Sequence, residues 1–102
     1  MSAPEAACRV DVWLWRARFF KTRGLAARMV AQGAVRLSRA GAEFRHDKPS
    51  RTVRPGDGLV VILGDRRLRV RIEALGARRG PAPEARALYL PLSESRPGGG
   101  EG

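Results

Sequence analysis

The sequence predicts an α+β fold in which two N-terminal helices pack on a small, mostly antiparallel sheet of three to five strands. Apolar residues recur with helical spacing from Val10 and again up to Gly33. A short period-two pattern follows at residues 34–38. A continuous apolar run at residues 59–63 then precedes the clearest alternation of the chain, at residues 67–74.

Length and composition predict one domain flanked by ends outside its core. At 102 residues, 43% of them hydrophobic, the chain is large enough for one modest core. We expect residues 1–8 to form a disordered arm, residues 9–92 the domain and residues 93–102 a disordered tail. The sequence shows neither a secretory signal nor a run approaching the roughly 18 apolar residues of a membrane span. We therefore expect a cytoplasmic protein.

The positive charge is concentrated in the first half of the chain. The formal net charge is +10, and residues 9–54 hold twelve basic and three acidic side chains. All other residues together hold eight basic and seven acidic side chains, so they are nearly neutral. Such a charge predicts attraction to nucleic acid or to an anionic membrane surface, and its distribution places the binding surface in the first half.

Residues suited to catalysis or metal binding are few and scattered. Cys8 is the only cysteine, which excludes a disulfide or a thiolate zinc site within the chain. His46 is the only histidine, and no partners for a catalytic base are grouped near it in the sequence. We therefore expect no catalytic residues, no metal site, no cofactor and no enzymatic activity.

The first predicted helix begins at Val10 and carries an apolar stripe on one face. Five residues with helical spacing form this stripe: Val10, Trp13, Leu14, Ala17 and Phe20. Asp11 lies in the first turn, where a carboxylate can cap the helix or compensate its dipole. The stripe predicts a helix that continues as far as Phe20.

The opposite side of this helix carries aromatic residues between arginines. Trp15 and Phe19 fall there beside Val12, and Arg16 and Arg18 flank them. One interpretation is a helix sandwiched in the core with both faces buried. The other is that Trp15 or Phe19 is partly exposed and stacks on an unpaired base or ribose. In either case the two arginines must emerge at the surface.

The second predicted helix opens at Thr22, a favourable N-cap, and stops at Gly33, a favourable residue just past a helix end. Lys21 and Arg23 bracket the cap, although a helix N-terminus disfavours a cation by roughly 0.3 to 1 kcal/mol. A bound phosphate reverses that sign, because free amides, the hydroxyl and both cations then converge on one anion. The alternative is a solvated loop. Six basic side chains against one acid within residues 9–33 favour phosphate.

Strands and turns are predicted for much of the remaining chain. Residues 34–38 form a short strand, and residues 39–52 form a basic loop in which Phe44 is an anchor. Residues 54–58 have the composition of a turn. The apolar run at residues 59–63 suits a strand that is buried on both faces.

A tight hairpin turn at residues 64–65 leads into the alternating strand. One face of that strand carries Arg67, Arg69 and Arg71. These arginines either provide solubility and protect a sheet edge or add auxiliary phosphate contacts. Residues 83–90 form a short helix or extend along the sheet.

The motifs, taken in order, resemble the RNA-binding domain named after ribosomal small-subunit protein four. The ordered set is Arg9-Val10-Asp11, Leu14, Arg18, Thr22-Arg23, Ala27-Arg28, Gly33, Val35, Pro49-Ser50, Val53 and Gly56-Asp57. Within that group the chain is most similar to the bacterial heat shock protein fifteen family. Its signature resembles Trp13-Leu14-Trp15, Ala17-Arg18-Phe19, Lys21-Thr22-Arg23 and Lys48-Pro49-Ser50. The chain departs from that family at residues 38–41, where the family has an Asn-Gly turn, and in its short tail.

This resemblance implies an RNA-binding module of the αL type whose basic helical face grips structured RNA. It also implies ribosomal RNA of the large subunit as the partner, and a heat-shock factor that acts on free or stalled large subunits. We expect a monomer that does not bind membranes. The predicted RNA-binding residues, most of them assigned by the resemblance, are Arg9, Arg16, Arg18, Lys21, Thr22, Arg23, Arg28, Lys48, Ser50 and Arg51.

Three alternative functions belong to other classes. One is a general RNA- or DNA-binding regulator; as a duplex DNA binder it would read bases with the outer face of the second helix, where only Arg28 and Gln32 qualify. A stand-alone relative of the RNA-binding module of pseudouridine synthases is another, although His46, Asp57 and Cys8 form no evident catalytic constellation. A chaperone-like protein would need a sizeable exposed apolar patch, which the pattern does not show.

Overall fold

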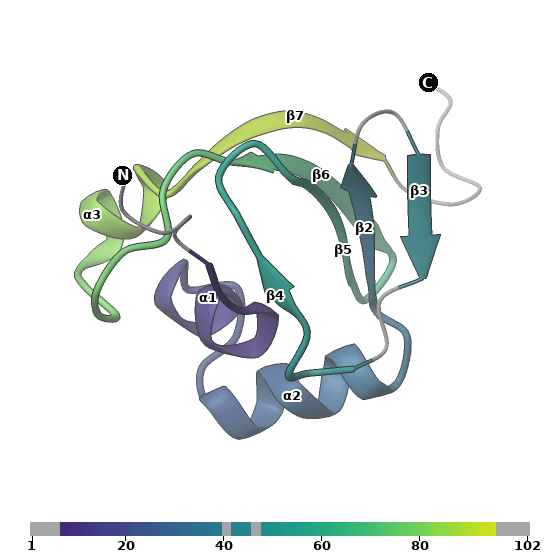
Figure 1. Ribbon diagram of the computed structural model, residues 1–102, viewed down its shortest axis with the longest axis horizontal. Coiled ribbons are helices and arrows are strands. Elements are labelled where there is room, and N and C mark those ends of the chain that lie inside the picture. Colours follow the sequence, from purple (N-terminus) through teal and green to yellow (C-terminus); the bar gives the residue numbers. More distant parts are fainter. Residues whose placement is uncertain (1–6, 40–41, 46–47, 96–102) are drawn as a thin grey trace, which may run out of the picture.

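The computed structural model of the protein describes residues 7–39, 42–45 and 48–95. Helices and strands in this part of the chain are shown in Figure 1. In chain order they are β1 (Cys8–Arg9), α1 (Val10–Arg16), α2 (Arg23–Ala31), β2 (Val35–Arg39), β3 (Ala42–Arg45), β4 (Thr52–Val53), β5 (Gly58–Leu63), β6 (Arg66–Ile72), α3 (Ala82–Arg86) and β7 (Tyr89–Ser95).

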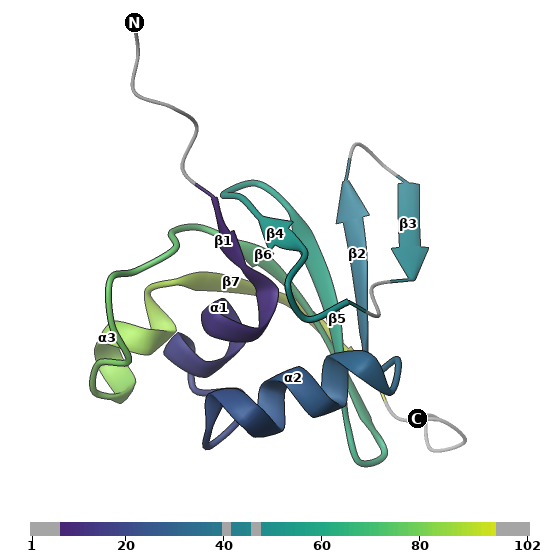
Figure 2. The ribbon, with the colours of Figure 1, turned by 60° about the horizontal axis from the view of Figure 1, so that its bottom comes forward.

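Five strands form one antiparallel sheet in the order β3-β2-β5-β6-β7, and β1 pairs with β4 in a separate two-stranded sheet. α1 and α2 lie against one face of the large sheet, and α3 lies at one end of the molecule (Figures 1 and 2). The α+β class predicted from the sequence, with two N-terminal helices on a mostly antiparallel sheet, is therefore confirmed. In the described part of the chain, no helix combines the length and apolar character needed to cross a membrane.

The core lies between α1, α2 and the sheet face that these helices cover. All five residues of the predicted α1 stripe are buried, and Trp13 and Leu14 are completely inaccessible. Completely burying a side chain such as Leu14 stabilises a fold by about 1.5 to 3 kcal/mol. The Trp13 indole N–H also has a partner, because it donates to the Ala74 carbonyl at 2.9 Å. The helical phase inferred from the sequence is therefore correct.

The length predicted for the first helix is wrong. α1 ends at Arg16, and the next residues close it with a Schellman motif. The Phe19 N–H donates to the Leu14 carbonyl at 3.0 Å, and the Arg18 N–H donates to the Trp15 carbonyl at 3.1 Å. Arg18 adopts the left-handed conformation, with φ of 66°. This motif usually contains glycine, so an arginine there gave no sign in the sequence that the helix ends.

α2 begins and ends as predicted. The Thr22 hydroxyl accepts a hydrogen bond from the Leu25 N–H at 3.0 Å, which is the expected N-cap contact. Gly33 follows the helix with φ of 87°, and its N–H donates to the Val30 carbonyl at 2.9 Å. Left-handed backbone suits glycine, so a local signal was sufficient here.

Residues 42–45 form strand β3 rather than part of a loop, and the prediction of a loop there is wrong. β3 pairs with β2 so that Phe44 stands opposite Leu37. Phe44 is 47% exposed, which makes its predicted anchor role wrong as well. A four-residue edge strand with one side exposed shows too little alternation to be recognised.

The C-terminal part of the chain forms both of the structures considered for it. Helix α3 occupies residues 82–86, and strand β7 then extends along β6. β7 continues to Ser95, three residues beyond the domain boundary expected at Leu92. Residues 1–6 of the expected arm and residues 96–102 of the expected tail lie outside the described residues.

The turn before β5 is held by a buried carboxylate. Asp57 is 4% exposed and accepts two bonds from Arg39, at 2.9 and 2.7 Å. It also accepts the backbone N–H of Arg54 at 2.9 Å. Burial acts to raise the pKa of Asp57, but the bonds from Arg39 and Arg54 outweigh burial and leave that pKa below its ordinary value.

The lowered pKa predicts how acid affects stability. The folded state binds the Asp57 proton less readily than the unfolded chain does, so the contribution of Asp57 to the free energy of unfolding is complete above its ordinary pKa of 3.8. That contribution is lost as pH falls through the lower pKa that Asp57 has in the folded state. In Asp57→Asn, urea unfolding at pH 7 should show a lower free energy of unfolding than the natural sequence, and the difference should shrink as pH falls below 3.8. A difference that stays constant with pH would contradict this account.

Candidate nucleic-acid interface

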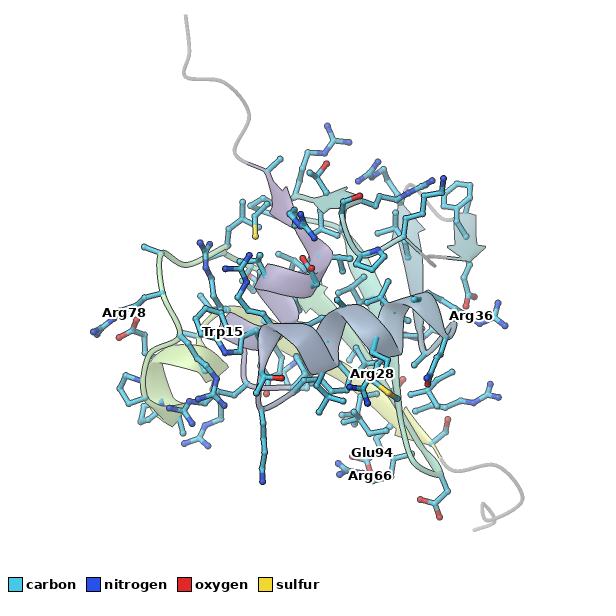
Figure 3. The ribbon with its side chains drawn as sticks, turned by 90° about the horizontal axis from the view of Figure 1, so that it is seen from below. Trp15, Arg28, Arg36, Arg66, Arg78 and Glu94 are labelled. Atoms are coloured by element: carbon cyan, nitrogen blue, oxygen red, sulfur yellow. The ribbon has the colours of Figure 1, made fainter. Side chains whose placement is uncertain are left out.

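The start of α2 presents basic side chains that lack acidic partners. Lys21, Thr22, Arg23 and Gly24 are all exposed, and so is Arg28 one turn further along the helix (Figure 3). Among the described residues, no ion pair joins these cations to an acid. The Thr22 hydroxyl accepts the Leu25 N–H, but a hydroxyl can donate its own proton at the same time. The cap therefore leaves a donor for an anion.

A second group of predicted residues is fixed against the start of α1 by backbone hydrogen bonds. The Val10 N–H donates to the Arg51 carbonyl at 2.8 Å, and the Asp11 N–H reaches the Pro49 carbonyl at 3.4 Å. The segment 48–51 therefore caps α1, a contact between distant residues that no local sequence pattern indicates. Its side chains Lys48, Ser50 and Arg51 are exposed.

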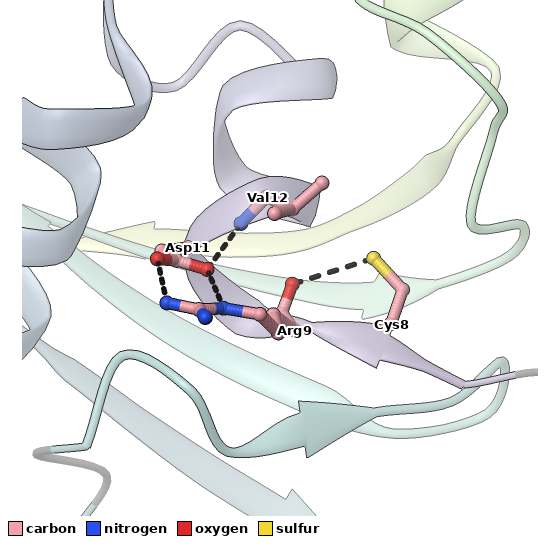
Figure 4. Close-up of polar contacts among 4 residues, drawn as sticks. All are labelled: Cys8, Arg9, Asp11 and Val12. Atoms are coloured by element: carbon pink, nitrogen blue, oxygen red, sulfur yellow. Dashed lines mark hydrogen bonds and ion pairs between the residues drawn. The ribbon is translucent and has the colours of Figure 1, made fainter.

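Arg9 joins this group through β1, which pairs with β4 so that Arg9 stands opposite Thr52. Figure 4 shows that the Asp11 carboxylate accepts two bonds from Arg9, at 3.0 and 2.8 Å, and the Val12 N–H at 2.7 Å. Asp11 is only 3% exposed. Its hydrogen bonds raise the pKa of Arg9. Asp11 is therefore not the N-cap residue, and it holds Arg9 in a fixed orientation.

Figure 1 shows the segment that leads into β4 running beside α2, and Figure 2 shows the same neighbourhood from another side. The segment 48–51 is therefore near both helices, although its sequence lies between β3 and β4. Arg54 follows β4, is exposed, and was not among the predicted residues. The concentration of basic residues in positions 9–54, which ends at Arg54, was the signal in the sequence that could have identified it.

The two arginines at the end of α1 are engaged with the segment before α3. Arg16 donates to the Gly76 carbonyl at 2.8 Å, and Arg18 donates to the Gly80 carbonyl at 2.7 Å. In the opposite direction, Arg79 donates to the Trp15 carbonyl at 3.2 Å. Arg18 is exposed beyond this contact, whereas Arg16 is half-buried and its Nε is enclosed. Arg16 therefore emerges less than expected.

The aromatic residues considered for base stacking lie in different surroundings. The centroid of the Phe19 ring lies 4.9 Å from that of the Tyr89 ring and 5.9 Å from that of the Trp13 ring, so Phe19 packs at the margin of the core. It also lines a surface groove of about 410 Å³ together with residues of β6 and β7. Trp15 is half-buried on α1. The interpretation that Trp15 and Phe19 share a helical face is wrong, because α1 ends between them.

The described residues contain no group of three or more His, Cys, Asp or Glu side chains that could hold a metal ion. Burial raises the pKa of the Cys8 thiol, and the nearby Arg16 opposes that shift only in part. His46 lies outside the described residues. The described part of this surface offers amides, hydroxyls and cations, which are groups that bind anions.

The chain is similar to known proteins in both sequence and structure. The S4 domain family model matches residues 8–38, from β1 through most of β2. Heat shock protein 15 of Escherichia coli K12 is 37% identical over 92 residues, which are 90% of this chain and 65% of that protein. The trimeric structure of Vibrio cholerae heat shock protein 15 has a TM-score of 0.74 and 38% identity, over 86% of this chain and 84% of that one. The chain belongs to the heat shock protein 15 family.

The family assignment confirms the resemblance found in the sequence. The heat shock protein 15 homolog of Haemophilus influenzae is also similar, with 39% identity over 89% of this chain and 66% of its own length. The chain therefore spans slightly less than two thirds of the length of these two curated heat shock protein 15 relatives. The S4 match includes the start of α2 and ends before the segment 48–51.

The left-handed conformation of Arg18 leads to a prediction about two variants whose difference in stability depends on the backbone alone. Arg18→Ala and Arg18→Gly both lose the bond to Gly80, but only glycine avoids the cost of roughly 1 to 2 kcal/mol for left-handed backbone. Urea unfolding should therefore find Arg18→Gly more stable than Arg18→Ala by about 1 kcal/mol. Equal stability of the two variants, or greater stability with alanine, would show that residue 18 is not left-handed.

Proposed function

We propose that this protein is a non-enzymatic binder of structured RNA, and that its partner is ribosomal RNA of the large subunit. The binding surface consists of the start of α2, the segment 48–51 and the adjoining Arg9. The observation that carries the proposal is the pair Lys21 and Arg23, two exposed cations at a helix N-terminus that has no compensating acid among the described residues.

Phosphate is the ligand that this helix start favours. The first amides of α2 and the helix dipole attract an anion, and Lys21 and Arg23 add two charges at the same end. In the absence of an anion the same cations are repelled by the dipole. An RNA backbone therefore gains hydrogen bonds and relieves a repulsion in the same contact.

The segment 48–51 extends this surface. Its backbone is fixed on α1 by the Pro49 and Arg51 carbonyls, so Lys48, Ser50 and Arg51 are presented without a large ordering cost on binding. Arg9 is likewise oriented by Asp11 before any ligand arrives. Fixed donors along a folded surface suit recognition of RNA shape through backbone contacts rather than base by base.

The predicted residues contribute unequally in this proposal. The phosphate contacts come from Arg9, Arg18, Lys21, Thr22, Arg23, Arg28, Lys48, Ser50 and Arg51. Arg16 is used mainly to hold the segment before α3, because its guanidinium already bonds a carbonyl there. A base that stacks on the protein would use Phe19 or Trp15 at the margin of this surface.

The biological setting is the finer part of the proposal. We propose a cytoplasmic factor of the heat-shock response that acts on free or stalled large subunits as a monomer. Crosslinking in cells followed by sequencing of the attached RNA tests the partner. Recovery of large-subunit ribosomal RNA supports the proposal, whereas scattered messenger RNA or DNA fragments would contradict it.

Thr22→Asp separates binding from folding at the helix start. Aspartate is at least as good an N-cap as threonine, and its charge suits the helix dipole, so thermal stability should be unchanged or higher. RNA affinity should fall on the order of tenfold or more, because a carboxylate then occupies the proposed phosphate position. Ala82→Asp, at the start of α3, adds the same charge at a different helix start and is the matched control. Undiminished RNA binding by Thr22→Asp would rule out the site.

The dependence of RNA affinity on salt concentration reports how many phosphates the protein contacts. Six to eight contacts predict that log affinity falls with log salt concentration at a slope of roughly −4 to −7. Lys21→Ala combined with Arg23→Ala should make the slope shallower by about 1.4 to 1.8. The double variant Arg78→Ala and Arg86→Ala removes equal charge near α3 and should leave the slope nearly unchanged. A slope shallower than about −2 for the natural sequence would refute electrostatic binding.

A further inference from the structure

A second row of arginines lies on the sheet face that α1 and α2 do not cover, called here the outer face. Along β6, Leu68, Val70 and Ile72 alternate with three exposed arginines. Val70 and Ile72 belong to the core, so the arginines point to the outer face. These three arginines, Arg67, Arg69 and Arg71, are called the β6 row.

The position of β6 excludes protection of a sheet edge as the reason for this row. β6 is paired with β5 on one side and with β7 on the other, so it is an interior strand. Charges that prevent association of strands are placed on edge strands instead. The edge-protection part of the account considered from the sequence is therefore wrong, which leaves solubility or phosphate contacts as explanations of the row.

The neighbouring strands provide no acid opposite the β6 row. The residues opposite it on β5 and β7 are Ile62, Val60, Gly58, Ser95, Ser93 and Leu90. Arg71 pairs at 2.9 Å with Glu73, which directly follows β6, whereas no acid among the described residues pairs with Arg67 or Arg69. Adjacent like charges on one face of a strand repel one another, and here cross-strand acids do not relieve that repulsion.

Burial of Val60 indicates how the arginine side chains lie. Val60 is only 7% exposed, although it points to the outer face and is not part of the core cluster. Its partners across the sheet are Arg36 on β2 and Arg69 on β6. Aliphatic stems of arginine can cover an apolar residue while the guanidinium remains in water. Stems of Arg36 and Arg69 lying over Val60 would account for its burial and leave both guanidinium groups in water.

We propose that the outer face is a second binding site for an RNA backbone, with the β6 row as its centre. Alternate residues of a strand are roughly 6.6 Å apart, which is close to the separation of successive phosphates in an extended RNA strand. Each guanidinium can bind a phosphate through two parallel hydrogen bonds, and the Ser93 and Ser95 hydroxyls flank the row with neutral donors.

A nucleic acid fits this face better than an acidic protein does. Protein interfaces depend on a central apolar anchor that fills a pocket, and of the positions beside the row only Leu90, at its end, is an exposed large apolar residue. A regular row of cations instead matches a regular row of phosphates. The row and the start of α2 lie on opposite sides of the sheet, so one molecule would hold two separate RNA segments.

This inference rests on the proposed function and gives it a new consequence, which is bridging of RNA. Two short RNA duplexes, one with a donor and one with an acceptor fluorophore, are mixed with the full chain. Energy transfer between the duplexes should appear at low salt. Arg67→Ser combined with Arg69→Ser should reduce that transfer at least fivefold and leave the affinity for a single duplex within about threefold. Serine is tolerated on an exposed strand face, so we expect both variants to fold.

Two further variants make the test decisive. The double variant Arg78→Ser and Arg86→Ser removes equal charge at the α3 end of the molecule, where Figure 3 shows Arg78, and should bridge normally. Thr22→Asp should also abolish bridging. It should leave weak binding of RNA at the β6 row, and adding Arg67→Ser and Arg69→Ser should remove that binding. Bridging that survives loss of Arg67 and Arg69 would overturn the inference. It would also be overturned if the variant without these arginines still bridged RNA and lost only its binding to anionic lipid vesicles. If Thr22→Asp were the only variant that behaved otherwise, with bridging and RNA affinity unchanged, the proposed α2 site would be overturned instead.

Discussion

The first turn of α1 has no side-chain N-cap. Much of the proposed RNA-binding surface depends on which groups accept hydrogen bonds from the amides of this turn. The amides of Val10 and Asp11 bond to carbonyls of the segment 48–51, and the Val12 amide bonds to the Asp11 carboxylate. Exposed helix amides would otherwise require water or another acceptor. The contact therefore closes the chain over about forty residues and fixes the segment 48–51 beside Arg9. Without it, these cations would belong to an unrestrained loop.

The acidic residues of the chain are used mainly to organise arginines. Asp11 and Asp57 are buried, and each binds one guanidinium through two hydrogen bonds. At the surface, Glu84 and Glu94 pair with arginines at the ends of the molecule (Figure 3). No such partner is found among the described residues for the cations at the start of α2. The distribution of acids therefore defines the basic surface as much as the arginines do.

Sequence reasoning succeeded where the cause of a structure is local. The α1 stripe, the Thr22 cap and the Gly33 helix end each follow from residue types a few positions apart. It failed where the cause is distant or the residue is unusual. Arg18 closes α1 in a conformation that favours glycine, β3 depends on pairing with β2, and Arg16 turns toward carbonyls sixty residues away. For the interface, the family resemblance and the concentration of charge pointed to the basic positions, but the sequence could not show which of them are already occupied by contacts within the protein.

The long closure between α1 and the segment 48–51 also has a kinetic meaning. The start of α2 needs only a single helix and its cap, and helices form rapidly from neighbouring residues. The segment 48–51 reaches its position only after a distant part of the chain has returned to α1, which is a slower kind of event. We therefore expect the two parts of the surface to mature at different times during synthesis, with the anion-attracting helix start present before the complete interface.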